Sequence, residues 1–297
     1  MHKKIIGSIF LLCLLGSCLA GNTSSSVTEA NVTQKTSGSN STPNSTPVDA
    51  HKNVVMLGHG NVAILRGEIN ARSTSKFLSE LMKIDSDDIY IYMITPGGSV
   101  THGHQIINAI EALSDMGKNV YCIGDVVNSM GFAILQSCPT RYVRSNSILM
   151  QHQMSLGLKG SIEHIRSRMK FVDQLEEVIE RIQYERLGMS EEEFTQFIMN
   201  DWWMYGQSAV NNSVADEVIN VLCTRELASE TISETVHTIF GSFNLIYSKC
   251  PLIWDPLDVE MEQTSNDTHN QLVEFYNENK QKYEISKFIE ETLFQQT

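Results

Sequence analysis

The fold is decided by residues 88–131, which read DIYIYMITPGGSVTHGHQIINAIEALSDMGKNVYCIGDVVNSMG. Residues 88–94 form a β-rich run that ends at Thr95-Pro96-Gly97-Gly98, and residues 100–116 have the pattern of a helix. A second strand is predicted at 119–124 and a second helix at 129–137. Strands that alternate with helices indicate an α/β domain with a largely parallel sheet. Sites in such sheets gather at the loops after the carboxyl ends of the strands.

The flanking sequence extends the same alternation. Short strands are predicted at 53–57, 62–69, 141–143 and 147–151, and a helix at 73–84. The longest helix is predicted at 161–187, with Gly188 as its C-cap, and Ser190 and Glu193 suit a capping box for the next helix. Its apolar residues repeat at intervals of three and four. Such a stripe serves either the core or an oligomer contact, and periodicity does not separate the two.

Composition limits the class of protein. The 297 residues are 41% hydrophobic and 19% charged, which excludes a collagen-like, coiled-coil or wholly disordered chain. The formal net charge is −13. Because an acidic chain repels phosphates and no basic patch interrupts it, a nucleic-acid partner is not expected.

The first 50 residues have the composition of an export signal and a tether. A basic start precedes the apolar run 5–15, a layout typical of a secretory signal peptide over 1–18. Leu15-Gly16-Ser17-Cys18 resembles a bacterial lipobox, which predicts lipidation of Cys18 in an envelope lipoprotein. A plain cleavage site nearby, giving a periplasmic or secreted protein, is the alternative. Residues 19–50 are rich in Ser, Thr and Asn and are predicted to be a disordered tether.

Four cysteines lie beyond the signal: Cys122, Cys138, Cys223 and Cys250. Their spacing fits neither a zinc site nor a Cys-x-x-Cys redox pair. Cys122 falls in an apolar strand and is interpreted as a small buried hydrophobe. Disulfides are compatible with export, and the sequence leaves their status open.

Three polar residues could form a nucleophilic site. Ser129 lies between a predicted strand and a predicted helix, His152 ends an apolar strand, and Asp201 follows a helix beside two tryptophans. A serine nucleophile needs a base, and that base needs a group that orients it. Each residue also has a structural interpretation: a helix cap for Ser129, a strand-end histidine, and a cap or surface charge for Asp201. The paired glycines at 97–98 could donate N–H groups to an oxyanion or simply form a turn.

Four segments, in this order and at similar intervals, resemble the Clp protease proteolytic subunit (ClpP) family: IYMITPGGSVTHG, CIGDVVNSMGFAIL, SNSILMQHQ, and NDWWMYGQSAV with VADEVI after it. The resemblance covers about residues 53–222. It implies a ClpP/crotonase-like spiral of βα units, with 161–187 as the handle helix through which heptameric rings stack. The peptidase domain is expected at 51–223, followed by a helical C-terminal extension at 224–297.

By this resemblance the chain is a serine endopeptidase that acts on peptides or unfolded proteins. Ser129 is the nucleophile, His152 the general base and acid, and Asp201 orients the histidine, while the N–H groups of Gly98 and Met130 form the oxyanion hole. No metal or organic cofactor is expected. The family's axial loops, which help engage an ATP-driven unfoldase, have no recognisable counterpart here, and export away from nucleotide argues against that partner.

Two other functions stay open beside the exported peptidase. One is a conventional ATP-dependent Clp subunit, and the other is an envelope lipoprotein that keeps the fold as a scaffold without turnover. The intact set of Ser129, His152 and Asp201 argues against the scaffold. In the extension, residues 248–256 are interpreted as an ordered loop and residues 270–294 as one or two polar helices. Packing anchors are expected at Leu272, Phe275, Tyr283, Phe288 and Ile289.

Overall fold

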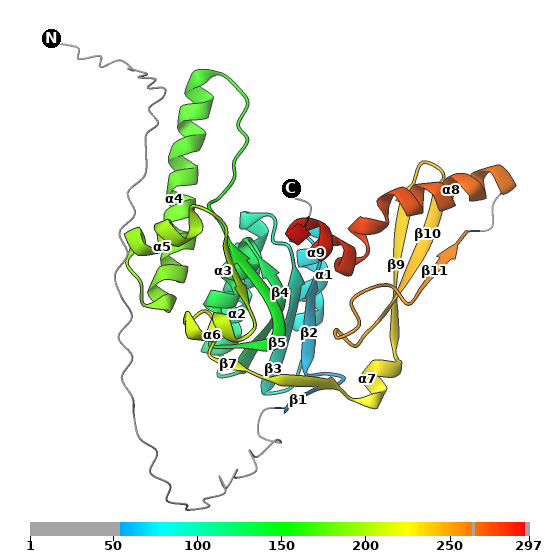
Figure 1. Cartoon of the computed structure of the whole chain (residues 1–297), viewed down its shortest axis with the longest axis horizontal. Coiled ribbons are helices and arrows are strands. Elements are labelled where there is room, and N and C mark those ends of the chain that lie inside the picture. The colour runs from blue at the N-terminus through cyan, green and yellow to red at the C-terminus, as the bar shows by residue number, and fades with distance from the viewer. Residues whose placement is uncertain (1–53, 263–264, 295–297) are drawn as a thin grey trace, which may run out of the picture. The chain divides into compact units, whose positions relative to one another are not determined.

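The computed structural model describes residues 54–262 and 265–294 of the chain (Figure 1). The chain divides into two units, residues 1–48 and 49–297, and every described residue belongs to the second. The expected signal peptide, the tether and Cys18 lie outside the described residues. Within residues 54–262 and 265–294, no helix is long and apolar enough to cross a membrane.

A six-stranded sheet forms the centre of the fold, with the order β2-β3-β4-β5-β6 and β7 paired to β5. The first four strands are parallel, and β6 runs antiparallel to β5. The strands are β2 (Val62–Arg66), β3 (Asp88–Thr95), β4 (Asn119–Asn128), β5 (Thr140–Gln151), β6 (Trp202–Tyr205) and β7 (Glu217–Val218).

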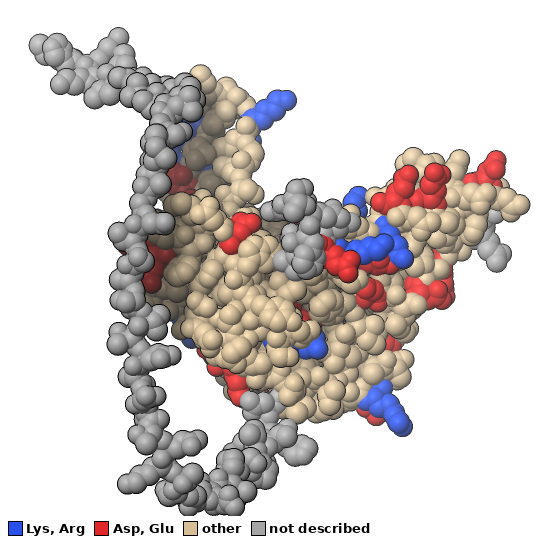
Figure 2. All heavy atoms as spheres, viewed as in Figure 1, with Lys and Arg blue, Asp and Glu red and all other residues tan. Residues whose placement is uncertain are grey.

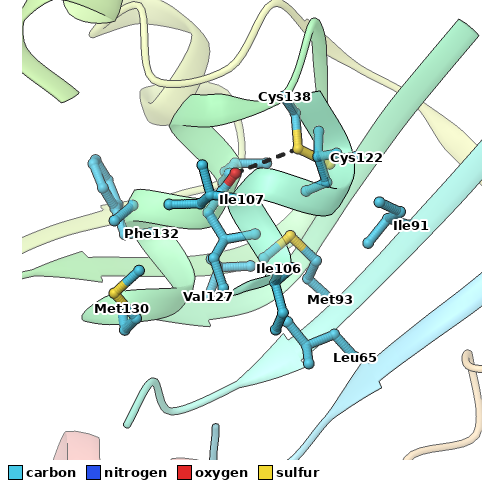
Figure 3. Packing of buried hydrophobic residues seen from close by; sticks show 14 of the residues in the cluster. Leu65, Ile91, Met93, Ile106, Ile107, Cys122, Val127, Met130, Phe132 and Cys138 are labelled. Atoms are coloured by element: carbon cyan, nitrogen blue, oxygen red, sulfur yellow. Dashed lines mark hydrogen bonds between the residues drawn. A yellow bond between two sulfur atoms is a disulfide. The ribbon is translucent and has the colours of Figure 1, made fainter. Parts of the chain in front are cut away.

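Both faces of this sheet are buried, which explains the nearly continuous apolar run in β3. Ile91 and Met93 point to a core shared with the helices α1 (Ala71–Leu81), α2 (Val100–Asp115) and α3 (Met130–Ser137). Figure 3 shows part of this helix-side core, with Cys122 and Cys138 joined by a disulfide. The alternate side chains, Tyr92 and Ile94, point to a second cluster on the opposite face.

Two predicted strands are longer than expected. β4 continues to Asn128, directly before Ser129, and the predicted strands at 141–143 and 147–151 form one continuous strand, β5. The β3–β4 register shifts between Met93 and Ile94, which leaves Asp125 as an extra residue in β4. The strand was predicted too short because the polar residues Asp125 and Asn128 interrupt the apolar pattern, although both side chains are buried.

The long helix α4 (Ile162–Leu187) begins and ends close to the predicted positions, and Gly188 is its left-handed C-cap. Its last third packs on the helix-side core through Ile179 and Leu187. Its first part extends away from the sheet in Figure 1, and the side chains of Ile162 and Phe171 are 68% and 58% exposed. The apolar stripe therefore belongs to the core only at its C-terminal end. The short helices α5 (Glu191–Ile198) and α6 (Gln207–Asn211) follow.

The C-terminal extension contains a sheet that was not expected. The three strands β9, β10 and β11 form an antiparallel sheet, and two helices follow at the expected place. Leu272 is fully buried against this sheet, as predicted for an anchor. The elements of this part are α7 (Arg225–Ser229), β9 (Thr231–Thr238), β10 (Gly241–Ser248), β11 (Asp258–Met261), α8 (Asn266–Asn279), a short 3-10 helix (Lys280–Lys282) and α9 (Ile285–Phe294).

The extension covers the second face of the central sheet. Leu252, Trp254, Ile285 and Ile289 pack against the cluster that contains Tyr92. β8 (Asn220–Cys223), which leads into the extension, pairs in parallel with β1 (Val54–Leu57). A disulfide between Cys223 and Cys250 closes the connection. The residues after the matched motifs therefore cover one of the two faces of the central sheet.

Candidate active site

Ser129 occupies a strained turn between β4 and α3. Its backbone has φ 54° and ψ −122°, a conformation that non-glycine residues rarely adopt. The Ser129 N–H donates to the carbonyl of Met150 on β5 at 2.9 Å, which fixes the turn to the neighbouring strand. Such a sharp strand-to-helix turn exposes a side-chain hydroxyl above the edge of the sheet. Ser129 makes no side-chain cap bond to α3, so the alternative role as a helix cap is not the one it has here.

His152 follows β5 directly and lies beside Ser129. Its Nε2 is 2.9 Å from Ser129 Oγ, within hydrogen-bonding distance. The two residues meet because β4 and β5 are adjacent parallel strands whose carboxyl ends share one edge of the sheet. The backbone N–H of His152 donates to the side chain of Gln151, and Gln151 in turn donates to Gln183 of α4. The long helix thus supports the strand end that carries the histidine.

Asp201 lies opposite His152 in the strand register but does not touch it. Because Gln151 pairs with Trp202 in the antiparallel β5–β6 ladder, the residue before Trp202 faces the residue after Gln151. Asp201 is exposed, has φ 40°, and makes no hydrogen bond or ion pair with any residue that the structure describes. The structure thus brings Ser129 and His152 together and leaves the Asp201 carboxylate apart from the imidazole.

Two backbone N–H groups are free beside the hydroxyl. Those of Gly98 and Met130 donate to no atom of the described residues, and both residues line one pocket with Ser129 and His152. Met130 is the first residue of α3, where the N–H has no partner within the helix. Donors arranged in this way can stabilise a negatively charged oxygen.

Gly97 is required for this arrangement. A Cβ at position 97 would lie 2.6 Å from the Ser129 Cβ and 2.7 Å from the carbonyl oxygen of Asn128. Gly97 also has φ 94°, in the region that favours glycine. The paired glycines therefore allow the loop after β3 to pack directly against the nucleophile turn.

The pocket beside Ser129 has a cavity of about 90 Å³ and an acidic wall. Glu176 and Glu180 of α4 line it, and neither forms an ion pair within the described part of the chain. Burial, followed by the charges of Glu176 and Glu191, raises the pKa of Glu180. These glutamates were not predicted as site residues, because acidic residues on a long helix are typical of a solvated face. The described residues contain no group of three metal-binding side chains.

Comparison with known proteins identifies the family. A family model described as Clp protease matches residues 49–221. The chain belongs to the Clp protease family. ATP-dependent Clp protease proteolytic subunit 2 of Bacillus licheniformis is 28% identical to it over 168 residues, which are 56% of this chain and 85% of that protein. The expected family and the α/β fold class are therefore confirmed. The Clp protease family is one of serine-type peptidases, whose members form oligomeric rings and act on peptides.

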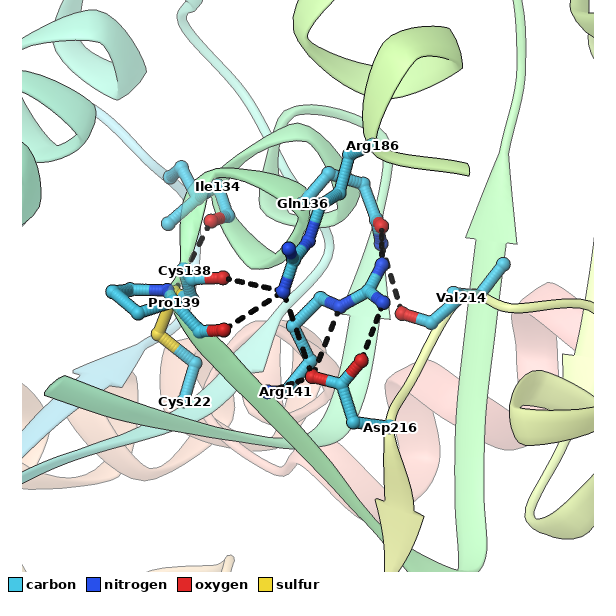
Figure 4. Close-up of polar contacts among 9 residues, drawn as sticks. All are labelled: Cys122, Ile134, Gln136, Cys138, Pro139, Arg141, Arg186, Val214 and Asp216. Carbon is cyan, nitrogen blue, oxygen red and sulfur yellow. Dashed lines mark hydrogen bonds and ion pairs between the residues drawn. A yellow bond between two sulfur atoms is a disulfide. The ribbon is translucent and has the colours of Figure 1, made fainter. Parts of the chain in front are cut away.

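A network of ion pairs and hydrogen bonds joins α3, β5 and α4 in the Clp protease fold (Figure 4). Arg141 of β5 pairs with Asp216 at 2.6 Å and donates to Gln136 of α3 at 2.6 Å. Burial opposes ionisation of Asp216, but its hydrogen bonds with Arg141 outweigh burial and lower its pKa. Arg186 of α4 donates to the carbonyl of Pro139 at 2.8 Å. These contacts tie α3, β5 and α4 together near the nucleophile.

A second polar cluster joins the sheet to the extension. The buried carboxylate oxygen Oδ2 of Asp125 accepts hydrogen bonds from Tyr92 Oη at 2.6 Å, Arg144 Nη1 at 2.9 Å and Trp254 Nε1 at 2.9 Å. Asp125 lies on β4, four positions before Ser129. No sequence pattern indicated this cluster, since Trp254 comes from a part of the chain with no recognised motif.

Proposed function

We propose that this chain is a serine endopeptidase in which Ser129 and His152 perform the chemistry. The observation that carries the proposal is the 2.9 Å contact between Ser129 Oγ and His152 Nε2 beside the free N–H groups of Gly98 and Met130. The substrate would be a peptide or an unfolded protein, in line with the activity of the family.

In the proposed mechanism, Ser129 Oγ attacks the scissile carbonyl while His152 Nε2 takes the hydroxyl proton. The resulting oxyanion accepts hydrogen bonds from the N–H groups of Gly98 and Met130. The protonated imidazole then donates its proton to the leaving amine, which leaves an acyl group on Ser129. His152 next takes a proton from water, and that water hydrolyses the acyl-enzyme.

Asp201 is proposed to orient His152 in the active form. The strand register places its backbone across from the histidine, so a change of the local backbone and side-chain rotamer could bring the carboxylate to Nδ1. The first part of α4 exposes apolar side chains in this chain, which supports assembly into a ring oligomer through this helix. A rearrangement of the backbone around Asp201 in such an assembly would couple oligomerisation to activity.

The test is labelling of the purified full chain with a fluorophosphonate probe, which modifies activated serines. Ser129→Ala and His152→Ala should each abolish labelling, and they should lower peptidase turnover by roughly three or more powers of ten. Ser155→Ala is the matched control, because Ser155 lines the same pocket, whereas the hydrogen bond of His152 Nε2 goes to Ser129 Oγ. Labelling that persists in Ser129→Ala would overturn the proposal. An unlabelled wild-type oligomer would favour the scaffold function.

We also propose that the protein is exported and works without an ATPase. The predicted signal peptide and the two disulfides support export, because disulfides persist in oxidising compartments. Metabolic labelling with palmitate should mark the wild-type chain and not Cys18→Ser if Cys18 is lipidated. A cytoplasmic location with an uncleaved N-terminus would instead support the conventional ATP-dependent subunit.

A further inference from the structure

A groove of about 590 Å³ lies between the central sheet and the C-terminal extension. Its walls come from β2 and α1 on one side and from α7, β9 and β10 on the other. It shares no lining residue with the pocket of Ser129 and His152. The peptidase proposal therefore does not account for this groove.

One wall of the groove is an unpaired sheet edge. β2 is the terminal strand of the six-stranded sheet and pairs only with β3. The carbonyl of Asn61 and the N–H of Gly67 face β3, so the alternating pattern turns the same groups of Ala63 and Leu65 toward β3 as well. The N–H and carbonyl groups of Val62, Ile64 and Arg66 therefore face outward, and these three residues line the groove.

These outward groups bond to no atom of the described residues. Unpaired N–H and carbonyl groups on an edge strand can pair with an added strand. A segment lying in the groove could therefore extend the sheet beyond β2. The exposed edge is short, and the groove limits access to it, so a single extended segment fits better than a broad surface.

The side of the groove formed by β2 and α1 also carries positive charge. Arg72 and Lys76 of α1, and Lys83 just after this helix, are exposed, line the groove and form no ion pair with any described residue. In all, five Lys or Arg residues and three Glu residues line the groove, in a chain whose formal net charge is −13. Figure 2 shows acidic side chains gathered over the C-terminal part of the chain on the face in view, where α8 and β11 lie. Basic residues thus outnumber acidic ones in the groove, although the chain as a whole is acidic.

The remaining charged groups of the groove leave these cations available. Lys249 is paired with Glu230, and Arg66 donates to the carbonyls of Trp254 and Ile253. Burial raises the pKa of Glu80, and the charges of Lys76, Lys83 and Lys249 oppose this shift. Apolar side chains supply the rest of the lining: Phe77, Ile84, Leu227 and Ile232. A peptide strand that alternates apolar and acidic residues would match both kinds of contact.

We propose that this groove binds an extended acidic peptide segment of a partner protein, which adds as a further strand to β2. Main-chain hydrogen bonds to Val62, Ile64 and Arg66 would hold the segment. The cations of α1 would select acidic side chains over basic ones. The binding does not depend on peptidase chemistry.

The probes are two fluorescein-labelled peptides of equal length with the same alternating valine and threonine frame, one carrying glutamates and the other lysines. Binding is measured by fluorescence anisotropy with the full chain bearing Ser129→Ala, so that neither peptide is cleaved. We expect the acidic peptide to bind at least about tenfold more tightly than the basic one. The preference should weaken as salt is added. Equal binding of the two peptides would overturn the proposal.

Two variants separate the charge from the strand. Lys76→Glu with Lys83→Glu should remove or reverse the preference for the acidic peptide, whereas Lys170→Glu on exposed α4 should leave it unchanged. Ile64→Pro removes an outward N–H and leaves the β2–β3 ladder intact, a position where edge strands tolerate proline. It should lower affinity at least about tenfold relative to Ile64→Thr, which keeps that N–H.

Three results would contradict the proposal. A lysine-reversed variant that keeps the acidic preference would exclude recognition by α1. Equal affinities of Ile64→Pro and Ile64→Thr would exclude strand addition, and circular dichroism of both variants shows whether each is folded. If Ile64→Pro does not fold, the proposal is tested by Lys76→Glu with Lys83→Glu alone. Failure of both peptides to bind would overturn the proposal, and protection of β2 from hydrogen exchange in an oligomer of the chain would then assign the groove to self-association.

Discussion

The nucleophile turn depends on the absence of one side chain. Gly97 faces the Ser129 Cβ and the Asn128 carbonyl, so any Cβ there must push the turn away. Because Ser129 already has a positive φ, its geometry is maintained by its surroundings and not by its own preference. A displacement of the hydroxyl by a fraction of an ångström would alter both the contact with His152 and the approach to the oxyanion donors.

We expect Gly97→Ala to lower turnover by about two powers of ten or more, because it misplaces the nucleophile. It should also lower the free energy of unfolding by about 2–4 kcal/mol through backbone strain and overpacking. Gly117→Ala is the matched control: Gly117 has a similar φ of 85°, but a Cβ there meets no atom within 4 Å. Gly117→Ala should lower the free energy of unfolding by only about 1 kcal/mol and leave turnover unchanged. Equal losses of activity in the two variants would contradict this role of Gly97.

Glu180 should make stability depend on pH. Its raised pKa means that the folded chain holds the proton more tightly than the unfolded chain, so the stability it contributes is present at acid pH. This contribution is lost as the pH rises through the folded-state pKa. Glu180→Gln should therefore raise the melting temperature at about pH 7 by roughly 1–2 °C, since solvent screens much of the effect, and change it little at about pH 4. Glu177→Gln, on an exposed position of the same helix, should show no such pH dependence. If Glu180→Gln raised the melting temperature more at acid pH than at neutral pH, the prediction would be wrong.

At the scale of elements, α4 and the extension each hold one of the two strands that lead to the catalytic residues. α4 holds Gln151 through Gln183, directly before His152. The extension holds Asp125 through Trp254, on the strand that leads to Ser129. A hydrogen bond to a buried carboxylate contributes more than an average one, because the ionised acceptor is costly to leave unpaired.

Trp254→Phe should lower the free energy of unfolding by about 1.5–3 kcal/mol, because Asp125 loses one of three donors. Urea denaturation measures the change. Trp203→Phe removes the same indole N–H from a partly exposed side chain that has no hydrogen bond to any described residue, and it should cost less than about 1 kcal/mol. Equal effects would mean that the Trp254–Asp125 bond does not support the sheet.

At the scale of the whole molecule, the Cys223–Cys250 disulfide joins the end of the matched region to the extension. The two residues are 27 positions apart, so their bond restricts the unfolded chain over the whole of β9 and β10. The extension buries its own small core around Leu272 and Phe243 and also covers the central sheet. Stability of the sheet and attachment of the extension are therefore linked.

Replacing both Cys223 and Cys250 with Ser should lower the free energy of unfolding by about 3–4 kcal/mol, in the range given by loop closure in the unfolded state. A reductant should lower the urea midpoint of the wild-type chain and lower it less in this variant, because only Cys122–Cys138 then remains to be reduced. Alkylation of the denatured, unreduced chain followed by mass spectrometry should leave these four cysteines unmodified. Modification of all four would contradict the disulfides and weaken the proposal of export.

The sequence by itself determined the alternation of strands and helices, the family, and the positions of Ser129 and His152. The alternation follows from apolar periodicity, and Ser129 and His152 are polar residues placed at strand ends. The family follows from the resemblance of four ordered motifs. Their contact was not predicted from local patterns, because it depends on the parallel pairing of β4 and β5, which brings the carboxyl ends of the two strands together. The interpretation of Cys122 as buried was also correct, but its bond to Cys138 was left open by spacing alone.

Only the tertiary structure decided the orientation of Asp201, the acidic wall of the pocket and the role of the extension. The antiparallel register brings Asp201 opposite His152, but the side-chain contact depends on a local backbone conformation that residue type does not specify. The β9–β10 sheet had an alternating pattern that could have been recognised, whereas its docking could not. Trp254 and Asp125 are 129 positions apart, and their contact depends on how two separately folded surfaces fit. Local sequence determines which surfaces form, and packing between distant segments determines which of them meet.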